Sequence, residues 1–375
     1  MKMQRFIETA FALTLAALLA ASCEKFRDTE NVTDTRGRGE LAVKLSLPQG
    51  GILPTRGETP TDEELTVNDI AVLVYDYSSS SSGALEAYQV SSVSQVLSSA
   101  PTFTFTLKPG TKIIEVVVNP PSGFKCSSLP TMDDFDSYVY SIDNDCSSSE
   151  LSLQMEGYDS CIITQGKSRY CEVAVRRICA RVALADITNS SGKSLTLQRA
   201  FLTNVSKSYS TTSGDGTPEG GSYNPQGRLY NTSTSIIDSS SDADVSLLTY
   251  KDLGRTLSDG STYSPSGSYF YCYQNESTAV PSGWEYGKSY NECTALVVVA
   301  SLDGATYYYP VVLDPSEMGS GATYGVERNK AYTVSLTITG PGSDDPNKPV
   351  TGASATSTIR ISDWSTGGSI DKSFE

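Results

Sequence analysis

Short stretches in which apolar and polar residues alternate occur along most of the chain, and this period of two is typical of strands with one buried face. The clearest early example is Leu41–Leu47. We predict further strands at Ile70–Tyr75, Phe103–Leu107, Ile113–Val118, Cys171–Val175, Ile178–Leu184, Leu195–Val205, Tyr269–Tyr273, Ala295–Leu302, Tyr307–Leu313, Tyr332–Thr339 and Thr356–Trp364. Helical periodicity is nearly absent, so the pattern predicts an all-β chain of β-sandwich domains with few short helices.

Turn-forming residues between these strands predict how some of them connect. A Pro-Gly turn at Pro109 separates Phe103–Leu107 from Ile113–Val118, so we expect these two strands to form a hairpin. One short helix is expected near Met132–Tyr140. Residues 206–268 are rich in Ser, Thr, Gly, Tyr and Asp and poor in aliphatic residues, which predicts long surface loops.

The first residues of the chain have a different pattern. Lys2 and Arg5 precede an apolar run that extends from Phe11 to Ala21 and is followed by Ser-Cys. A positive start, a short apolar run and small residues before a cut site predict a secretory signal peptide. Cys23 resembles the cysteine of a lipobox, where a diacylglycerol is attached to the thiol and the chain is cut just before it. An ordinary signal peptide without lipidation is the alternative.

The region after Cys23 is polar on both sides of the first strand. Residues 24–40 are rich in Thr, Asp, Glu and Arg and predict a flexible tether. After Leu41–Leu47, residues 54–60 contain two prolines, a glycine and Arg56. This stretch is expected to be an exposed loop that proteases can reach.

Charge and composition exclude several classes of function. The chain has 375 residues and a formal net charge of −15 at pH 7, which argues against nucleic acid as a partner and against direct binding to anionic lipid. Histidine is absent. That absence removes Ser–His–Asp and Cys–His catalysis and His-ligated zinc. We therefore predict that the protein is not an enzyme, and we predict no cofactor and no metal site.

Besides Cys23, the chain has seven cysteines: Cys126, Cys146, Cys161, Cys171, Cys179, Cys272 and Cys293. In an oxidising compartment such cysteines can pair as disulfides, and an odd number leaves one thiol over or pairs it between chains. No C-x-x-C spacing occurs, so a zinc ribbon or a redox motif is not indicated. The spacing does not reveal which cysteines pair.

Two segments resemble the FimA-type major fimbrillins, the type V pilins. Residues 326–343, VERNKAYTVSLTITGPGS, look like the closing segment of that family, and Trp364 falls where the family has a late tryptophan. Residues 177–181, RICAR, are similar to the R-x-x-A-R segment that opens the second domain of the family. The layout of the leader also matches, whereas the loops at 206–268 have no counterpart. The resemblance implies two transthyretin-like β-sandwich domains in tandem.

The resemblance also implies a mechanism of assembly. A lipoprotein precursor reaches the cell surface, and an arginine-specific protease cuts a loop after the first strand. The lipidated tether leaves with that strand, and a strand of a neighbouring subunit fills the groove. Arg56 is the residue carried over as the cleavage site. Arg36 and Arg38 are rivals, but they precede the first strand, so cutting there would open no groove.

The predicted site residues fall into two groups. The propeptide strand buries Leu41, Val43, Leu45 and Leu47. The donor strand is expected near the C-terminus, at Thr358, Ile359, Arg360, Ile361 and Ser362, because this segment also alternates and lies near a free end. The alternative is that Thr356–Trp364 is an ordinary internal strand of the second domain.

We divide the chain into a signal peptide (1–22), a lipidated tether with the propeptide strand (23–56), an N-terminal β-sandwich (57–175) and a C-terminal β-sandwich (176–375). The expected partners are other copies of the chain, other fimbrial subunits, the outer membrane through the precursor's lipid, and the protease. A host or bacterial surface ligand is a further candidate. The expected location is the outer membrane and then the fimbrium. The alternatives are a surface-anchored glycan-binding lipoprotein, or a tip or minor fimbrial subunit.

Overall fold

The structure is a computed structural model. It describes residues 37–46, 61, 63–77, 83–96, 101–141, 152–203, 208–210, 250–265, 267–277, 294–313, 324–344, 350, 354–364 and 369–374. The predictions for Cys23, Arg36, Leu47 and Arg56 lie outside these residues.

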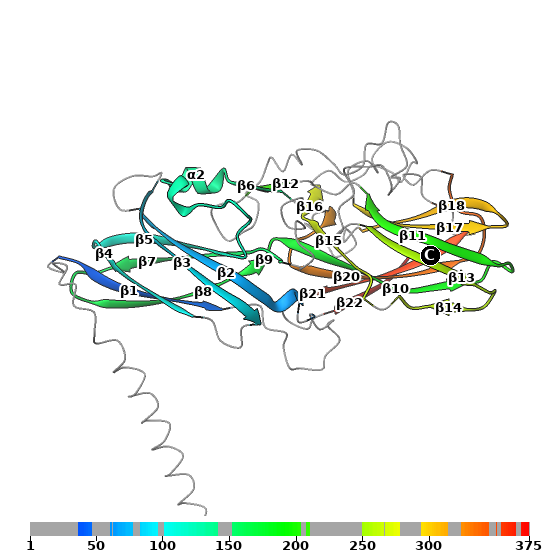
Figure 1. The fold of residues 1–375 in the computed structure, drawn as a ribbon, viewed down its shortest axis with the longest axis horizontal. Coiled ribbons are helices and arrows are strands. Elements are labelled where there is room, and N and C mark those ends of the chain that lie inside the picture. The colour runs from blue at the N-terminus through cyan, green and yellow to red at the C-terminus, as the bar shows by residue number, and fades with distance from the viewer. Residues whose placement is uncertain are drawn as a thin grey trace, which may run out of the picture.

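The N-terminal half of the described chain forms two sheets that pack face to face (Figure 1). The first has the order β4-β1-β8, with β1 (Gly39–Ser46), β4 (Thr102–Leu107) and β8 (Ser168–Ala174). The second has the order β3-β2-β5-β7-β9, with β2 (Thr66–Asp76), β3 (Ala84–Val96), β5 (Gly110–Val118), β7 (Met155–Ile163) and β9 (Arg176–Arg177).

The C-terminal half forms a second pair of sheets. One has the order β14-β10-β20-β21-β22, from β14 (Thr262–Tyr263), β10 (Cys179–Asn189), β20 (Lys330–Ile338), β21 (Ala355–Asp363) and β22 (Ser369–Phe374), and β15 (Tyr269–Tyr273) also pairs with β10. The other has the order β13-β11-β17-β18, from β13 (Tyr250–Leu257), β11 (Leu195–Thr203), β17 (Ala295–Leu302) and β18 (Ala305–Val312). Figure 1 shows the two sandwiches end to end.

Several small elements lie outside the four large sheets. Two short ladders join β6 (Val139–Ser141) to β12 (Ser208–Ser210) and β16 (Asn275–Ser277) to β19 (Tyr324–Val326). The described helical turns are η1 (Glu63–Leu65), η2 (Cys126–Ser128) and α2 (Met132–Asp136). Helix α2 confirms the short helix expected near Met132, and its Thr131 and Asp134 side chains form a capping box.

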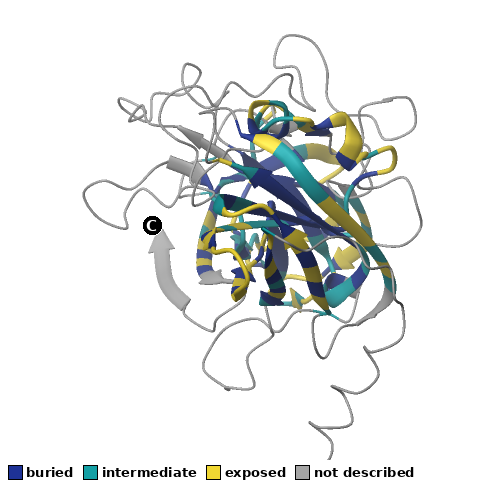
Figure 2. Cartoon of the chain, turned by 90° about the vertical axis from the view of Figure 1, so that its left-hand side faces the viewer, coloured by how far each residue is buried: buried dark blue, intermediate teal, exposed yellow. Residues whose placement is uncertain are grey.

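Alternation along the strands accounts for the cores. In β1 and β4 every second residue is buried, and these side chains join those of β2, β5, β7 and β8 in one apolar cluster. A second cluster fills the C-terminal sandwich and continues under α2. Figure 2 shows buried residues between the layers and exposed residues on the outside. The all-β sandwich fold predicted from the sequence is confirmed.

The predicted hairpin between Phe103–Leu107 and Ile113–Val118 is wrong. Strand β4 pairs with β1, whereas β5 pairs with β2 and β7 in the opposite sheet. The Pro-Gly turn carries the chain from one sheet to the other, with Gly110 at a φ of 130°. The sequence pattern did not predict strands β3, β7 and β22. Residues 206–268 were predicted as loops, but parts of them form the strands β12, β13 and β14.

Candidate functional site

Strand β1 is the middle strand of its three-stranded sheet. It pairs antiparallel with β4, from Gly39 opposite Leu107 to Lys44 opposite Thr102. On its other side it pairs parallel with β8, from Glu40 opposite Ser168 to Ser46 opposite Ala174. Both sides of the β1 backbone are therefore bound within this sheet, and β1 is the only described strand that pairs with β4 or with β8.

The buried face of β1 consists of the residues predicted to form the propeptide strand. Leu41 and Val43 are fully buried and Leu45 is 2% exposed. On the opposite face of the strand, Glu40 and Lys44 are exposed and Ala42 is half-buried. Burial of each of these three apolar side chains stabilises the sandwich by about 1.5–3 kcal/mol. Leu47 lies outside the described residues.

Both ends of β1 are fastened to the β8 side of the sandwich. Near its start, Glu40 donates its backbone N–H to the carbonyl of Lys167 at 3.0 Å. Gly39 is pressed so closely against the same turn that a Cβ there would lie 2.5 Å from the carbonyl oxygen of Thr164. At the other end, Val175 donates its N–H to the carbonyl of Ser46 at 3.0 Å. These contacts fix the register of β1 in its groove.

After β1 the described residues resume at Thr61, which lies beside a cluster of buried polar side chains between the two sandwiches. Glu64, in η1, is fully buried. The Thr61 backbone N–H donates to its Oε2 at 2.8 Å, and its own N–H donates to the Thr61 hydroxyl at 3.3 Å. Thr61 and Glu64 are therefore held to each other by hydrogen bonds that do not involve β1.

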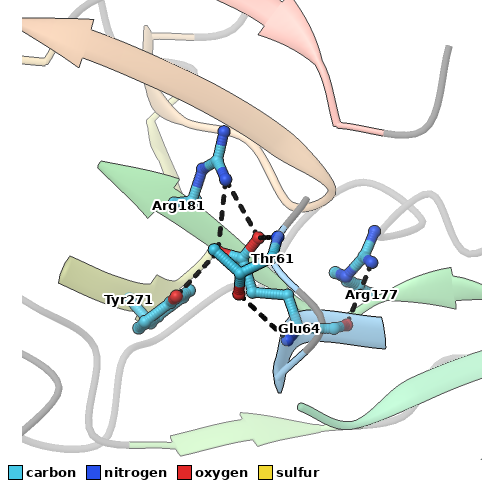
Figure 3. A network of polar contacts seen from close by, with 5 residues as sticks. All are labelled: Thr61, Glu64, Arg177, Arg181 and Tyr271. Atoms are coloured by element: carbon cyan, nitrogen blue, oxygen red, sulfur yellow. Dashed lines mark hydrogen bonds and ion pairs between the residues drawn. The ribbon is translucent and has the colours of Figure 1, made fainter. Parts of the chain in front are cut away.

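Glu64 accepts hydrogen bonds from two residues of the C-terminal sandwich (Figure 3). Arg181 Nη1 donates to its Oε2 at 2.9 Å and to its Oε1 at 3.3 Å. The hydroxyl of Tyr271 donates to its Oε1 at 2.7 Å. Burial and the adjacent carboxylate raise the pKa of Tyr271. The Glu64 charge is thus compensated by donors from β10 and β15.

A second buried arginine, Arg177, binds the backbone of the same turn. Its Nη2 donates to the carbonyl of Glu64 at 3.1 Å, and its guanidinium lies 4.4 Å from the centre of the Trp364 ring. Burial lowers the pKa of Arg177. The Trp364 ring also stacks on Tyr271 at 5.9 Å and faces Arg181 at 5.5 Å. The Trp364 ring therefore makes cation–π contacts with both buried arginines.

Asn329 connects the strands around this cluster. Its Oδ1 accepts from the backbone N–H of Arg177 at 3.3 Å, and its carbonyl accepts from that of Trp364 at 3.1 Å. Its φ of 56° lies in the left-handed region that asparagine tolerates.

The two segments that resemble the fimbrillins both contribute residues to this cluster. The R-x-x-A-R segment supplies Arg177 and Arg181, and the closing segment supplies Asn329. The sequence analysis singled out these segments and Trp364 but missed Glu64, the residue on which they converge. The available signal was a carboxylate a few residues before the apolar strand β2.

The predicted donor strand lies inside the C-terminal sheet. Residues 358–362 belong to β21, which pairs with β20 on one side and β22 on the other. Ile359 and Ile361 are buried at 3% and 6% exposure. The structure thus shows this segment as an internal strand, and β22 occupies the edge of the sheet.

The remaining candidate chemistry is sparse in the described part of the chain. The structure joins none of its five cysteines in a disulfide. It contains no group of three potential metal ligands. No helix among the described residues has the length and apolar character needed to cross a membrane.

Three solved structures show what this fold is similar to. A fimbrilin, FimA, from Porphyromonas gingivalis W83 is 15% identical with a TM-score of 0.58, over 89% of this chain and 99% of that one. A candidate cell adhesion protein from Bacteroides eggerthii is 18% identical with a TM-score of 0.58, over 87% of this chain and 96% of that one. The tip fimbrial protein Mfa3 from P. gingivalis is 16% identical with a TM-score of 0.51, over 87% and 100%. No protein-family model and no curated protein matches the chain.

Proposed function

We propose that this protein is a structural subunit of surface fimbriae that supports adhesion. It is made as a lipoprotein precursor and polymerises by strand exchange after cleavage. The observation that carries the proposal is the position of β1, which is the middle strand of its sheet and the first strand among the described residues. The fold similarity to a fimbrilin and to a tip fimbrial protein supports the same conclusion.

Loss of β1 creates a binding site for another strand. It exposes the backbone groups of β4 and β8 that face it, together with the apolar surface that packs on Leu41, Val43 and Leu45. Unpaired strand edges beside an apolar trench bind extended peptides readily. A strand that places apolar side chains at alternate positions therefore recovers what β1 contributed.

A cut between β1 and η1 is the step that allows this exchange. Arg56 is the only arginine between Ser46 and Thr61. A cut there separates β1 from the rest of the subunit, while Glu64 keeps the new N-terminal region attached. Arg38 precedes β1, and its Nη1 donates to the Thr106 carbonyl at 3.3 Å. A cut after Arg36 or Arg38 leaves β1 attached to the subunit.

The incoming strand comes from the C-terminal end of a neighbouring subunit. The segment 358–362 can donate only if β21 leaves β20 and withdraws Ile359 and Ile361 from the core. Strand β22 needs to break one ladder only, because it is the edge strand. The exchange therefore begins at β22, and the role of 358–362 is open to a direct test.

Lipidation of Cys23, the arginine-specific protease, other fimbrial subunits and a surface ligand complete the proposed assembly. The proposed path runs from the outer membrane to the fimbrium, with residues 57–175 and 176–375 as the two domains of the mature subunit. A surface-anchored glycan-binding lipoprotein is the competing class. It would keep its N-terminus and stay monomeric.

N-terminal sequencing of the assembled, surface-shed protein tests the proposal. We expect the mature chain to begin at Gly57 and to form ladders that resist mild heating in detergent. An Arg56→Gln variant should stay uncut and monomeric, whereas the control Arg38→Gln should assemble normally. A wild-type protein recovered from the surface with its lipidated Cys23 and no ladder would contradict the proposal.

A further inference from the structure

Strands β7 and β8 follow each other along the chain but belong to opposite sheets of the N-terminal sandwich. A tight turn joins them and is closed by a hydrogen bond from the Lys167 N–H to the Thr164 carbonyl at 3.1 Å. At the far end their backbones nearly touch, because a Cβ on Gly157 would lie 2.2 Å from the carbonyl oxygen of Ala174. The two strands are therefore held close at both ends.

Cys161 on β7 and Cys171 on β8 meet between these two close approaches. Both residues are buried, with 5% and 4% of their surface exposed, in the same apolar cluster as the β1 side chains. The Cys161 thiol donates a hydrogen bond to the sulfur of Cys171, which lowers the pKa of Cys171. This hydrogen bond brings the two sulfurs close together across the sandwich, as a disulfide requires.

Cys179 and Cys272 do not share this geometry, although they lie on the paired strands β10 and β15. Cys179 is opposite Tyr273, and Cys272 is opposite Ala180. Successive residues of a strand point to opposite faces, so these two thiols lie on opposite faces of the sheet.

We propose that Cys161 and Cys171 are oxidised to an intrachain disulfide that fastens β8 to β7. The oxidant is a disulfide of general form R–S–S–R. The Cys171 thiolate attacks one of its sulfurs and releases one R–S⁻. The Cys161 thiol then loses its proton and attacks the Cys171 sulfur of the mixed disulfide, releasing the second R–S⁻. Two protein thiols are oxidised and one oxidant disulfide is reduced. The reaction takes place during folding, before both sulfurs are buried.

The bond has a role in the proposed strand exchange, and this part of the inference rests on the proposed function. Strand β1 is the only described ladder partner of β8. When β1 leaves, β8 keeps its turn, its contact at Gly157 and its buried Val173. A covalent link to β7, which stays paired with β5, holds this wall of the groove in position until the next strand arrives.

Peptide mapping of the intact precursor tests the bond itself. The protein is isolated from the envelope of its own host with free thiols alkylated at lysis, then digested with trypsin without reduction. Trypsin cuts after Lys167 and Arg169, so Cys171 falls in the peptide 170–176 and Cys161 in the peptide 126–167. We expect these two peptides to be joined and to separate on reduction. Recovery of 170–176 only as an alkylated peptide overturns the proposal.

Peptide 126–167 also contains Cys126 and Cys146, so matched variants identify the partner. Cys161→Ser should release peptide 170–176 with an alkylated Cys171. Cys126→Ser and Cys146→Ser should leave the joined pair intact. The assignment of Cys161 as the partner is overturned if the two peptides stay joined in Cys161→Ser but separate in Cys126→Ser or Cys146→Ser.

Hydrogen exchange then tests the role of the bond. Wild type is compared with the double variant Cys161→Ser, Cys171→Ser, before and after cleavage at Arg56. Residues 168–174 should exchange similarly in the two precursors but at least tenfold faster in the cleaved double variant. Equal exchange in the two cleaved proteins overturns the role. If β1 stays bound after cleavage in both proteins, the proposed function fails, while the mapped disulfide stands.

Discussion

Arg181 and Glu64 form an ion pair of 2.9 Å in which both side chains are completely buried, although the residues are 117 positions apart. The pair joins the turn that precedes β2 to the first strand of the C-terminal sandwich. A buried pair adds little net stability, but removing one partner leaves an uncompensated charge in a buried site.

Replacing Glu64 by alanine should lower the free energy of unfolding by about 3–5 kcal/mol, because Arg181 loses the carboxylate that compensates its buried charge. Urea denaturation of Glu64→Ala, of a control variant and of wild type measures the loss of unfolding free energy. The exposed pair Lys193–Asp303 is the matched control, and Asp303→Ala should leave the denaturation midpoint nearly unchanged, because both side chains are more than half exposed. A Glu64→Ala midpoint equal to wild type would contradict the assigned role.

Leu41→Ala should destabilise the uncut precursor by about 2–5 kcal/mol, since it leaves a cavity between the sheets. The assembled protein has lost β1 and should be as stable as wild-type assembled protein. Thermal or urea unfolding of both forms provides the comparison.

Lys44→Ala is the control for this effect, because Lys44 lies on the exposed face of the same strand. It should change neither form. If Leu41→Ala weakened the assembled protein as much as the precursor, β1 would have to remain in the mature subunit.

The sequence revealed local features of the fold better than its pairing. The alternation in Leu41–Leu47 indicated the buried face of β1, because a half-buried strand is encoded residue by residue. The partner of β4 was mistaken because β1, more than fifty residues earlier, occupies the place where a hairpin was expected. Alternation also could not show that 358–362 is an internal strand. That position depends on the pairing of β22 with its outer edge, which the pattern within 358–362 does not reveal.

The charged cluster was hidden for a related reason. A carboxylate in a polar segment reads as a surface residue, and Glu64 is buried only because Arg181 and Tyr271 reach it from the other sandwich. The R-x-x-A-R segment did carry a signal. Two arginines in an otherwise apolar segment need buried anionic or aromatic partners.

Glu115, in β5, should make the stability of the protein depend on pH. Burial raises its pKa well above the ordinary value of 4.5, and the nearby carboxylates of Glu156 in β7 and Asp136 in α2 raise it further. Above pH 4.5 the folded state therefore keeps a proton that the unfolded chain releases. The free energy of unfolding contributed by Glu115 falls as pH rises, by up to about 1.4 kcal/mol per pH unit, until the folded-state pKa is passed.

Glu115→Gln removes this titration and keeps the shape of the side chain. The variant should gain stability relative to wild type as pH is raised from 4.5 towards neutrality, and the two proteins should differ least at the acidic end. Urea unfolding at a series of pH values measures the difference. Parallel pH profiles would show that Glu115 is not the group responsible.

The identity of the donor strand depends on whether β21 must leave its sheet. Ser335 of β20 lies directly opposite Thr358 of β21, and neither side chain is buried. Cysteines at both positions would lock the two strands together, while β22 would stay free to move.

We expect the oxidised double variant Ser335→Cys, Thr358→Cys to polymerise after cleavage, because β22 needs to break only its single ladder to β21. Ladder formation in detergent gels measures assembly. Thr358→Cys alone is the control for the substitution and should assemble like wild type. If the locked protein stays monomeric while the single variant assembles, residues 358–362 must leave β20. The donor would then be the strand predicted from the sequence, and its release would require Ile359 and Ile361 to come out of the C-terminal core.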